Sequence, residues 1–180
     1  MRRAAHGILL TLLWLTGGCD TGDAGPAGGG RLEARWTGAD TAAFAARATA
    51  EWCDSLGLLE IHATAGDTGV GLAVYRRGGI APGHYPIRPP DSAGTAPPAA
   101  AVVLRWFSQT AVQGFQATGG ELSVRRGPGG ALAGIFTAKA SAVTGGKQLT
   151  VTGSFEGIRA SPVARGCYAP PPPDTSAGVH

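Results

Sequence analysis

Apolar and polar residues alternate along several short segments of this chain, and this alternation is the feature that most limits its fold. The clearest case is 149–156, where the large apolar side chains share one face of an extended strand and the hydroxyl and carboxyl side chains share the other. A period of two indicates a half-buried antiparallel β-strand rather than a helix. The same pattern is found at 32–37, 46–52, 59–64, 69–76, 101–108, 112–118, 121–126 and 131–139.

Glycine-rich tetrapeptides separate many of these segments. Residues 118–121 and 144–147 each contain Gly-Gly, which suits the positive φ angles of a two-residue hairpin turn. Residues 66–69 and 127–130 supply two further tight links. Turn chemistry therefore accounts for much of the glycine content, and we expect two meanders, at about 46–76 and 101–158.

Eight or nine short strands without helices between them predict an all-β domain. We expect an antiparallel β-sandwich, with a closed, lipocalin-like β-barrel as the alternative. The alanines in 46–52 also leave open a helix that starts at about residue 40. The single folded domain is expected to span 31–168, and the proline-rich residues 169–180 are expected to form a disordered tail.

The first residues have the order of an export signal. Arg2 and Arg3 are followed by an apolar run at 8–15 and by small residues that lead to Cys19. A charged start, a short apolar run and small residues are typical of a signal peptide, and the run is too short to span a membrane. Residues 1–18 are therefore expected to be removed during export.

The cysteine at the end of this segment resembles the lipobox of bacterial lipoproteins. In that family the thiol is acylated with diacylglycerol, and cleavage makes the cysteine the new N-terminus. Leu15 stands four positions before Cys19, whereas the family usually places it three before. The resemblance implies a lipid on Cys19 and a flexible, glycine-rich tether over 19–30. Ordinary cleavage within 20–27 would instead give a secreted protein.

Two cysteines remain in the expected domain. Cys53 and Cys167 form an even pair, and exported proteins fold in compartments that permit disulfides. We expect a bridge, worth about 4–5 kcal/mol in the chain-entropy model. The alternatives are two free thiols or a metal pair, and the latter is poorly supported because zinc needs four ligands.

The charge of the chain argues against nucleic-acid binding. Without Arg2 and Arg3 the formal net charge falls from +3 to +1. Binding to phosphate backbones needs a concentrated basic face. The pairs at 76–77 and 125–126 are isolated and lie beside glycines, which is typical of solvated strand ends.

The connection 77–100 is the best candidate for a recognition loop, since long structureless connections are often functional. His84, Tyr85 and Arg88 within it are candidate ligand-contacting residues. Glu60 and His62 share one face of a predicted strand, as a metal or acid–base pair would, although a solvated face is the ordinary interpretation of such a pair. We find no catalytic, phosphate-binding or metal-binding motif, and we expect no catalytic residue, metal or cofactor.

The later part of the chain loosely resembles uncharacterised all-β domains of bacterial envelope lipoproteins, over about 80–158. The residues that carry this resemblance are a Gly-x-Tyr element, Leu122-Ser-Val124, Gly134-Ile-Phe136 and Gly153-Ser-Phe155. It brings no known activity.

Together these features predict a non-enzymatic envelope lipoprotein, anchored to a membrane through Cys19, whose β-domain binds an unidentified partner or serves a structural role. Its side of the membrane, periplasmic or outer-surface, stays open. The first alternative is a small-molecule or lipid carrier with an apolar barrel cavity, and the third candidate is an envelope enzyme.

Overall fold

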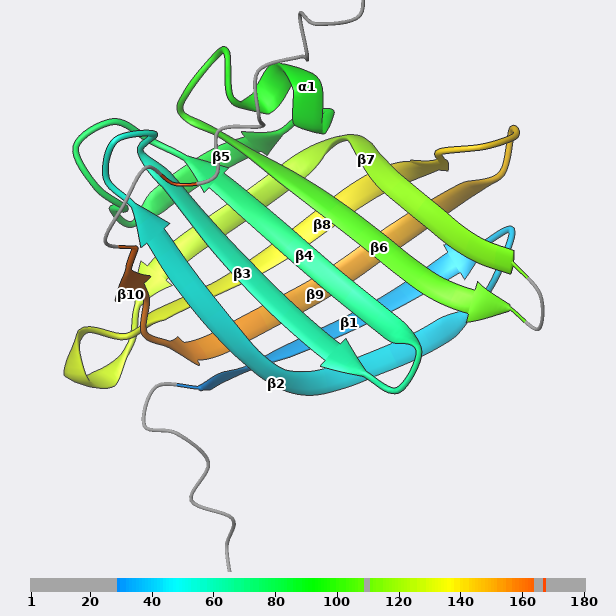
Figure 1. Ribbon diagram of the computed structural model, residues 1–180, viewed down its shortest axis with the longest axis horizontal. Helices are drawn as coiled ribbons and strands as arrows, with labels where there is room; N and C mark the ends of the chain where they lie inside the picture. The colour runs from blue at the N-terminus through cyan, green and yellow to red at the C-terminus, as the bar shows by residue number, and fades with distance from the viewer. Residues whose placement is uncertain (1–28, 109–110, 164–166, 168–180) are drawn as a thin grey trace, which may run out of the picture.

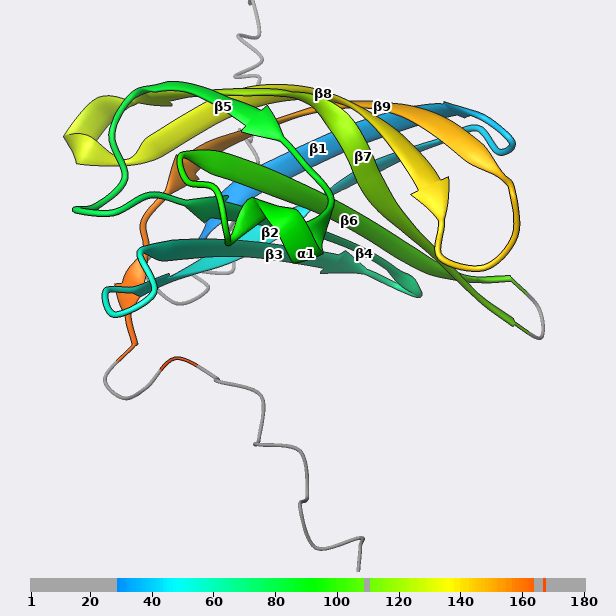
Figure 2. The ribbon, with the colours of Figure 1, turned by 90° about the horizontal axis from the view of Figure 1, so that it is seen from above.

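The chain folds into a closed antiparallel β-barrel (Figures 1 and 2). The computed structural model describes residues 29–108, 111–163 and 167. The all-β prediction is confirmed, and of the two architectures that the sequence left open the structure is the closed barrel rather than the sandwich. The elements are β1 (Gly30–Gly38), β2 (Ala42–Cys53), β3 (Leu58–Ala65), β4 (Thr68–Tyr75), β5 (Gly83–Ile87), α1 (Pro90–Ala93), β6 (Ala99–Ser108), β7 (Ala111–Arg126), a 3-10 turn at Pro128–Gly130, β8 (Leu132–Ala142), β9 (Gln148–Ile158) and β10 (Ser161–Pro162).

The barrel is an up-and-down meander with one insertion. Strands β1, β2, β3, β4, β6, β7, β8 and β9 each pair antiparallel with the next, and β9 pairs with β1 to close the ring. Strand β5 lies between β6 and β7 at one end of the barrel. The two-residue strand β10 runs parallel to the end of β2. Closure leaves no free edge along the long strands.

The structure of strand β7 shows that the hairpin expected at 118–121 is wrong. The Gly-Gly at 118–121 does not form a hairpin, and the two expected strands on either side of it are one continuous strand of 16 residues. The register of β7 against β8 shifts between Ala117 and Gly119, and Gly120 has a φ of 138°. The first half of β7 pairs with β6 and the second half with β5. The glycines therefore bend the strand where it changes partner.

The other three glycine-rich links form where they were expected. Gly66 and Gly145, both with positive φ, lie in the connections from β3 to β4 and from β8 to β9. The second connection spans the five residues 143–147, so the two-residue turn expected at 144–147 is wrong in its length. Gly129 lies in the 3-10 turn between β7 and β8. The alanine-rich segment 46–52 belongs to β2, so no helix forms there, because its alternate residues are needed on the inner face of the barrel.

The inward-facing side chains form one buried cluster to which all nine barrel strands contribute. Near the hairpin that joins β1 to β2, the rings of Trp36, Trp106 and Phe115 stack with centroids 5.3 and 5.0 Å apart. Further along, Phe136 on β8 pairs with Gly153 on β9. Side chains thus occupy the space that the strands enclose.

Cys53 and Cys167 form the expected disulfide, with their Cα atoms 5.7 Å apart. It joins the end of β2 to the segment that follows β10. A backbone hydrogen bond from Val163 to the carbonyl oxygen of Trp52, 3.0 Å long, ties the same two segments together. The free-thiol and metal-pair alternatives do not apply to these two cysteines.

The described helical structure is short. Helix α1 has four residues, and within the described residues no helix has the length and apolar character that a bilayer crossing requires.

Candidate functional site: an arginine-lined hollow

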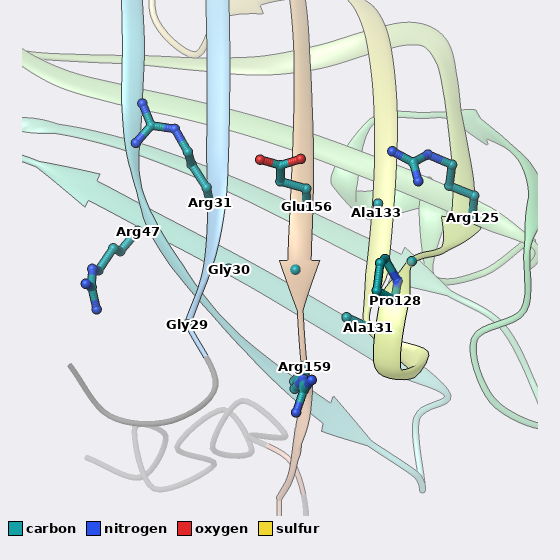
Figure 3. A pocket seen from close by; sticks show the side chains of 12 residues that line it. Gly29, Gly30, Arg31, Arg47, Arg125, Pro128, Ala131, Ala133, Glu156 and Arg159 are labelled. Carbon is teal, nitrogen blue, oxygen red and sulfur yellow. The ribbon is translucent and has the colours of Figure 1, made fainter. Parts of the chain in front are cut away.

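A hollow of about 620 Å³ lies on the outer face of the barrel, at the end where β1 begins (Figure 3). It is open to solvent, and its walls come from β1, β2, β7, β8 and β9 together with the turn between β7 and β8. Its lining residues are Gly29, Gly30, Arg31, Arg47, Arg125, Gly127, Pro128, Ala131, Ala133, Glu156, Gly157 and Arg159.

Strand register brings the charged residues of the hollow together. Arg31 on β1 lies opposite Arg47 on β2 and opposite Glu156 on β9. Arg125 on β7 lies opposite Ala133 on β8. These residues occupy outward-facing positions of neighbouring strands, so their side chains lie in one band across the barrel wall. Figure 3 shows the carboxylate of Glu156 between Arg31 and Arg125.

A β-bulge in β9 shapes the floor of the hollow. Gly134 pairs with Phe155 and Leu132 pairs with Ile158, so β9 has one more residue than β8 over this stretch. Gly157, within the bulge, has a φ of 67°, a conformation that favours glycine. Bulges kink a strand and redirect its side chains, and they are frequent at barrel rims.

Small residues keep the floor of the hollow low. Ala131 and Ala133 are buried and project only methyl groups. Gly157, which also lines the hollow, carries no side chain at all. The long side chains of the hollow therefore stand at its rim, around a floor of backbone and methyl groups.

The lining is strongly basic. It carries four guanidinium groups against one carboxylate, a formal excess of three positive charges. Arg31 also forms an ion pair with Glu33, whose Oε1 lies 2.6 Å from its Nε, and both side chains are 55% exposed. Glu33 therefore offsets part of the charge of Arg31. Guanidinium groups bind phosphate and carboxylate oxygens through paired hydrogen bonds, so this arrangement suits an anion.

The expected recognition loop at 77–100 is partly structured, because it contains β5 and α1. Tyr85 faces the barrel interior, is 1% exposed, and donates a 2.7 Å hydrogen bond to the carbonyl oxygen of Ala81. It is a core residue. Arg88 is exposed, and its backbone nitrogen donates to the carbonyl oxygen of Ala100 at 2.9 Å.

His84 lies on the outer face of β5 within a polar cluster. Its Nδ1 is 2.9 Å from Oε1 of Glu121 and 3.0 Å from Oγ of Ser123. Both partners contact the same ring nitrogen, whereas a catalytic triad needs the serine and the carboxylate on opposite nitrogens. The side chains of His84 and Glu121 are 74% and 64% exposed, so we interpret this cluster as a surface contact between β5 and β7.

Glu60 and His62 share the outer face of β3, as the alternation predicted. They line a hollow of about 200 Å³ together with Tyr75. The pKa of the Tyr75 hydroxyl is raised above its usual value, mainly because the side chain is partly buried. The negative charge of the Glu60 carboxylate adds a smaller increase. Among the described residues, no group of three or more histidine, cysteine or acidic side chains could hold a metal.

The arginine hollow was not predicted, because its residues are distant in the sequence. The pair at 125–126 was interpreted as a solvated strand end. In the structure Arg125 lines the hollow, while Arg126 donates hydrogen bonds to the carbonyl oxygens of Ile80 and Gly130, both 3.4 Å away. The available signal was the placement of Arg47 and Arg125 within the predicted strands 46–52 and 121–126, and of Arg31 directly before the predicted strand 32–37. Cys19 lies outside the described residues.

The fold and the hollow together define a closed β-barrel with a basic outer surface at one end. No protein-family model matches the chain, and comparisons with curated proteins and with solved structures also gave no match.

Proposed function

We propose that this protein is a cell-envelope lipoprotein whose barrel is a non-enzymatic binding or structural domain, tethered to a membrane through a lipid on Cys19. The signal-like residues 1–18 and the lipobox-like cysteine are the sequence basis for export and anchoring. The secreted form, cleaved within 20–27, is the alternative.

The observation that carries the proposal for the domain is its filled interior. Side chains from all nine barrel strands meet in one buried cluster, and the larger hollows lie on the outer surface and open to solvent. A small-molecule carrier needs an apolar cavity with room for its ligand. A filled barrel favours a rigid body that acts through its outer surface, and it speaks against the carrier.

The disulfide between Cys53 and Cys167 supports export. Disulfides persist in oxidising compartments and are rare in the cytosol of mesophiles. The covalent link between the end of β2 and the segment after β10 also suits a domain that works outside the cytosol.

The exposed polar side chains of the barrel favour a binding function over a catalytic one. His84 is held by Glu121 and Ser123 through a single ring nitrogen. The hollow contains arginines and one exposed glutamate, without a serine, cysteine or histidine nucleophile among its lining residues. Such a surface can bind an anion, and an envelope enzyme is the less supported interpretation.

Metabolic labelling with a clickable fatty acid tests the anchor. We expect the wild-type protein to incorporate the label, and we expect Cys19→Ala to lose it. The double variant Cys53→Ser/Cys167→Ser is the matched control and should remain labelled, because its lipobox-like segment is intact. An unlabelled wild-type protein, or a label that persists in Cys19→Ala, would overturn the proposal.

A further inference from the structure

We propose that the arginine-lined hollow docks the barrel onto anionic phospholipid headgroups of the membrane that holds the tether. This inference rests on the proposed function, since it takes the chain to be anchored at Cys19. It adds to that function an orientation: the end of the barrel where β1 begins faces the bilayer.

The position of the hollow is the first argument. Gly29 and Gly30 line it, so the described chain enters the barrel at the hollow itself. Gly29 lies ten positions after Cys19 in the sequence. A segment of that length spans at most about 36 Å when fully extended and roughly 16–19 Å as a flexible coil. An anchor at Cys19 therefore keeps the hollow close to the headgroups, at a high local concentration.

The charge of the hollow is the second argument. Its four guanidinium groups come from β1, β2, β7 and the segment just after β9, and small residues, among them the buried Ala131 and Ala133, line the hollow with them. Guanidinium groups match the paired oxygens of a phosphodiester. A surface rich in anionic lipid attracts such groups strongly, and the attraction decays within about 8 Å at physiological ionic strength. The tether supplies the proximity that this short range requires.

Glu156 is the one acidic residue that lines the hollow, so its variant should change binding in the opposite direction to the arginine variants. Its carboxylate lies opposite Arg31 within the hollow and opposes the approach of phosphate. Removing that charge should strengthen binding to headgroups, whereas removing arginines should weaken it. A response in both directions would separate a specific hollow from a general effect of the overall charge.

Vesicle co-sedimentation of the unacylated chain tests the proposal. Residues 20–180 retain every described residue of the barrel and carry no lipid, so binding reports on the protein surface alone. We expect binding to phosphatidylcholine vesicles that contain phosphatidylglycerol, little binding to pure phosphatidylcholine, and a loss of binding as salt is raised.

Paired variants locate the binding surface. Arg125→Gln/Arg159→Gln should reduce the partition coefficient roughly 25-fold, about 5-fold for each charge. Glu156→Gln should raise it about 5-fold. Lys139→Gln/Lys147→Gln is the matched control, because it removes two exposed positive charges outside the hollow, and it should change binding far less. Circular dichroism confirms that each variant is folded.

Three results would overturn the proposal. The first is equal binding to vesicles with and without phosphatidylglycerol, and the second is an equal loss in the lysine and arginine variants. The third is saturable binding of inorganic phosphate to the wild-type chain without binding to phosphatidylglycerol vesicles, which would assign the hollow to a free phosphate group. None of these bears on Cys19, so a failure here is distinct from a failure of the lipid-labelling experiment.

Discussion

The ring of Phe136 on β8 fills the space in which Gly153 on β9 would otherwise carry a side chain. The arrangement is repeated in reverse two residues along, where Phe155 on β9 packs against Gly134 on β8, and a Cβ at Gly134 would lie 2.6 Å from its ring. Two Gly-x-Phe tripeptides on antiparallel strands thus fit each other reciprocally. Each glycine makes room for an aromatic ring, which helps to fill the barrel without crowding it.

The first prediction concerns this fit. Gly153→Ala should destabilise the fold by about 1–3 kcal/mol, because the new methyl group would meet both the Phe136 ring and the Glu33 carbonyl oxygen, the latter at 2.6 Å. Urea unfolding measures the change. Gly119→Ala, on β7, is the control, since a Cβ there has nothing within 4 Å. Equal stability of the two variants would contradict the packing described.

The disulfide provides the second prediction. Cys53→Ser/Cys167→Ser should lower the free energy of unfolding by up to about 4–5 kcal/mol, because the bridge constrains the unfolded chain over a sequence separation of 114 residues. Reductant should lower the urea midpoint of the wild-type protein and leave that of the double variant unchanged. If reductant acted equally on both proteins, the bridge would not be the cause.

Tyr75 provides the third prediction. Its hydroxyl should titrate above the usual 10.0, as measured by the ultraviolet absorbance of phenolate and assigned with Tyr75→Phe. Glu60→Gln should lower this pKa and leave the contribution of burial in place. Glu121→Gln, whose carboxylate pairs with His84 instead, should leave it unchanged. A pKa of Tyr75 that Glu60→Gln does not move would contradict the assigned cause.

The raised pKa of Tyr75 also makes the free energy of unfolding depend on pH. Because the pKa of Tyr75 is raised in the folded state, its protonated form stabilises the fold fully below pH 10.0. That stabilisation is lost as the pH rises through the folded-state pKa. The difference in stability between wild type and Tyr75→Phe should therefore change only in alkaline solution, and a change near neutral pH would contradict this account.

The filled interior provides the fourth prediction. A fluorescent fatty-acid probe should show no saturable binding to the mature chain, because the side chains of all nine barrel strands already occupy the interior. A fatty-acid carrier protein serves as the positive control for the probe. Stoichiometric, saturable binding would favour the carrier over the binding or structural domain proposed above.

Local pattern predicted most of the strands, since alternation depends on neighbouring residues. Closure of the barrel depends on pairing between β1 and β9, which are more than a hundred residues apart, and no local pattern reports it. The same limit explains Gly119-Gly120. A glycine pair fits a hairpin turn and a bulge equally well, and what decides is that β7 changes partner from β6 to β5 at that point.

The candidate site was less predictable than the fold. The four arginines of the hollow are each ordinary surface residues in sequence. Strand register brings Arg31, Arg47 and Arg125 together, and Arg159 follows directly after the end of β9. Tyr85 illustrates the opposite case. It was a candidate ligand residue because the segment around it is rich in glycine and proline, but β5 turns its ring into the core.

Measuring the intact mass of the protein extracted from membranes is the decisive test of export and of lipidation at Cys19. We expect a chain that begins at Cys19 and carries the added mass of diacylglycerol. A soluble chain that starts after residue 20 without lipid, or a chain that still begins at Met1, would contradict it.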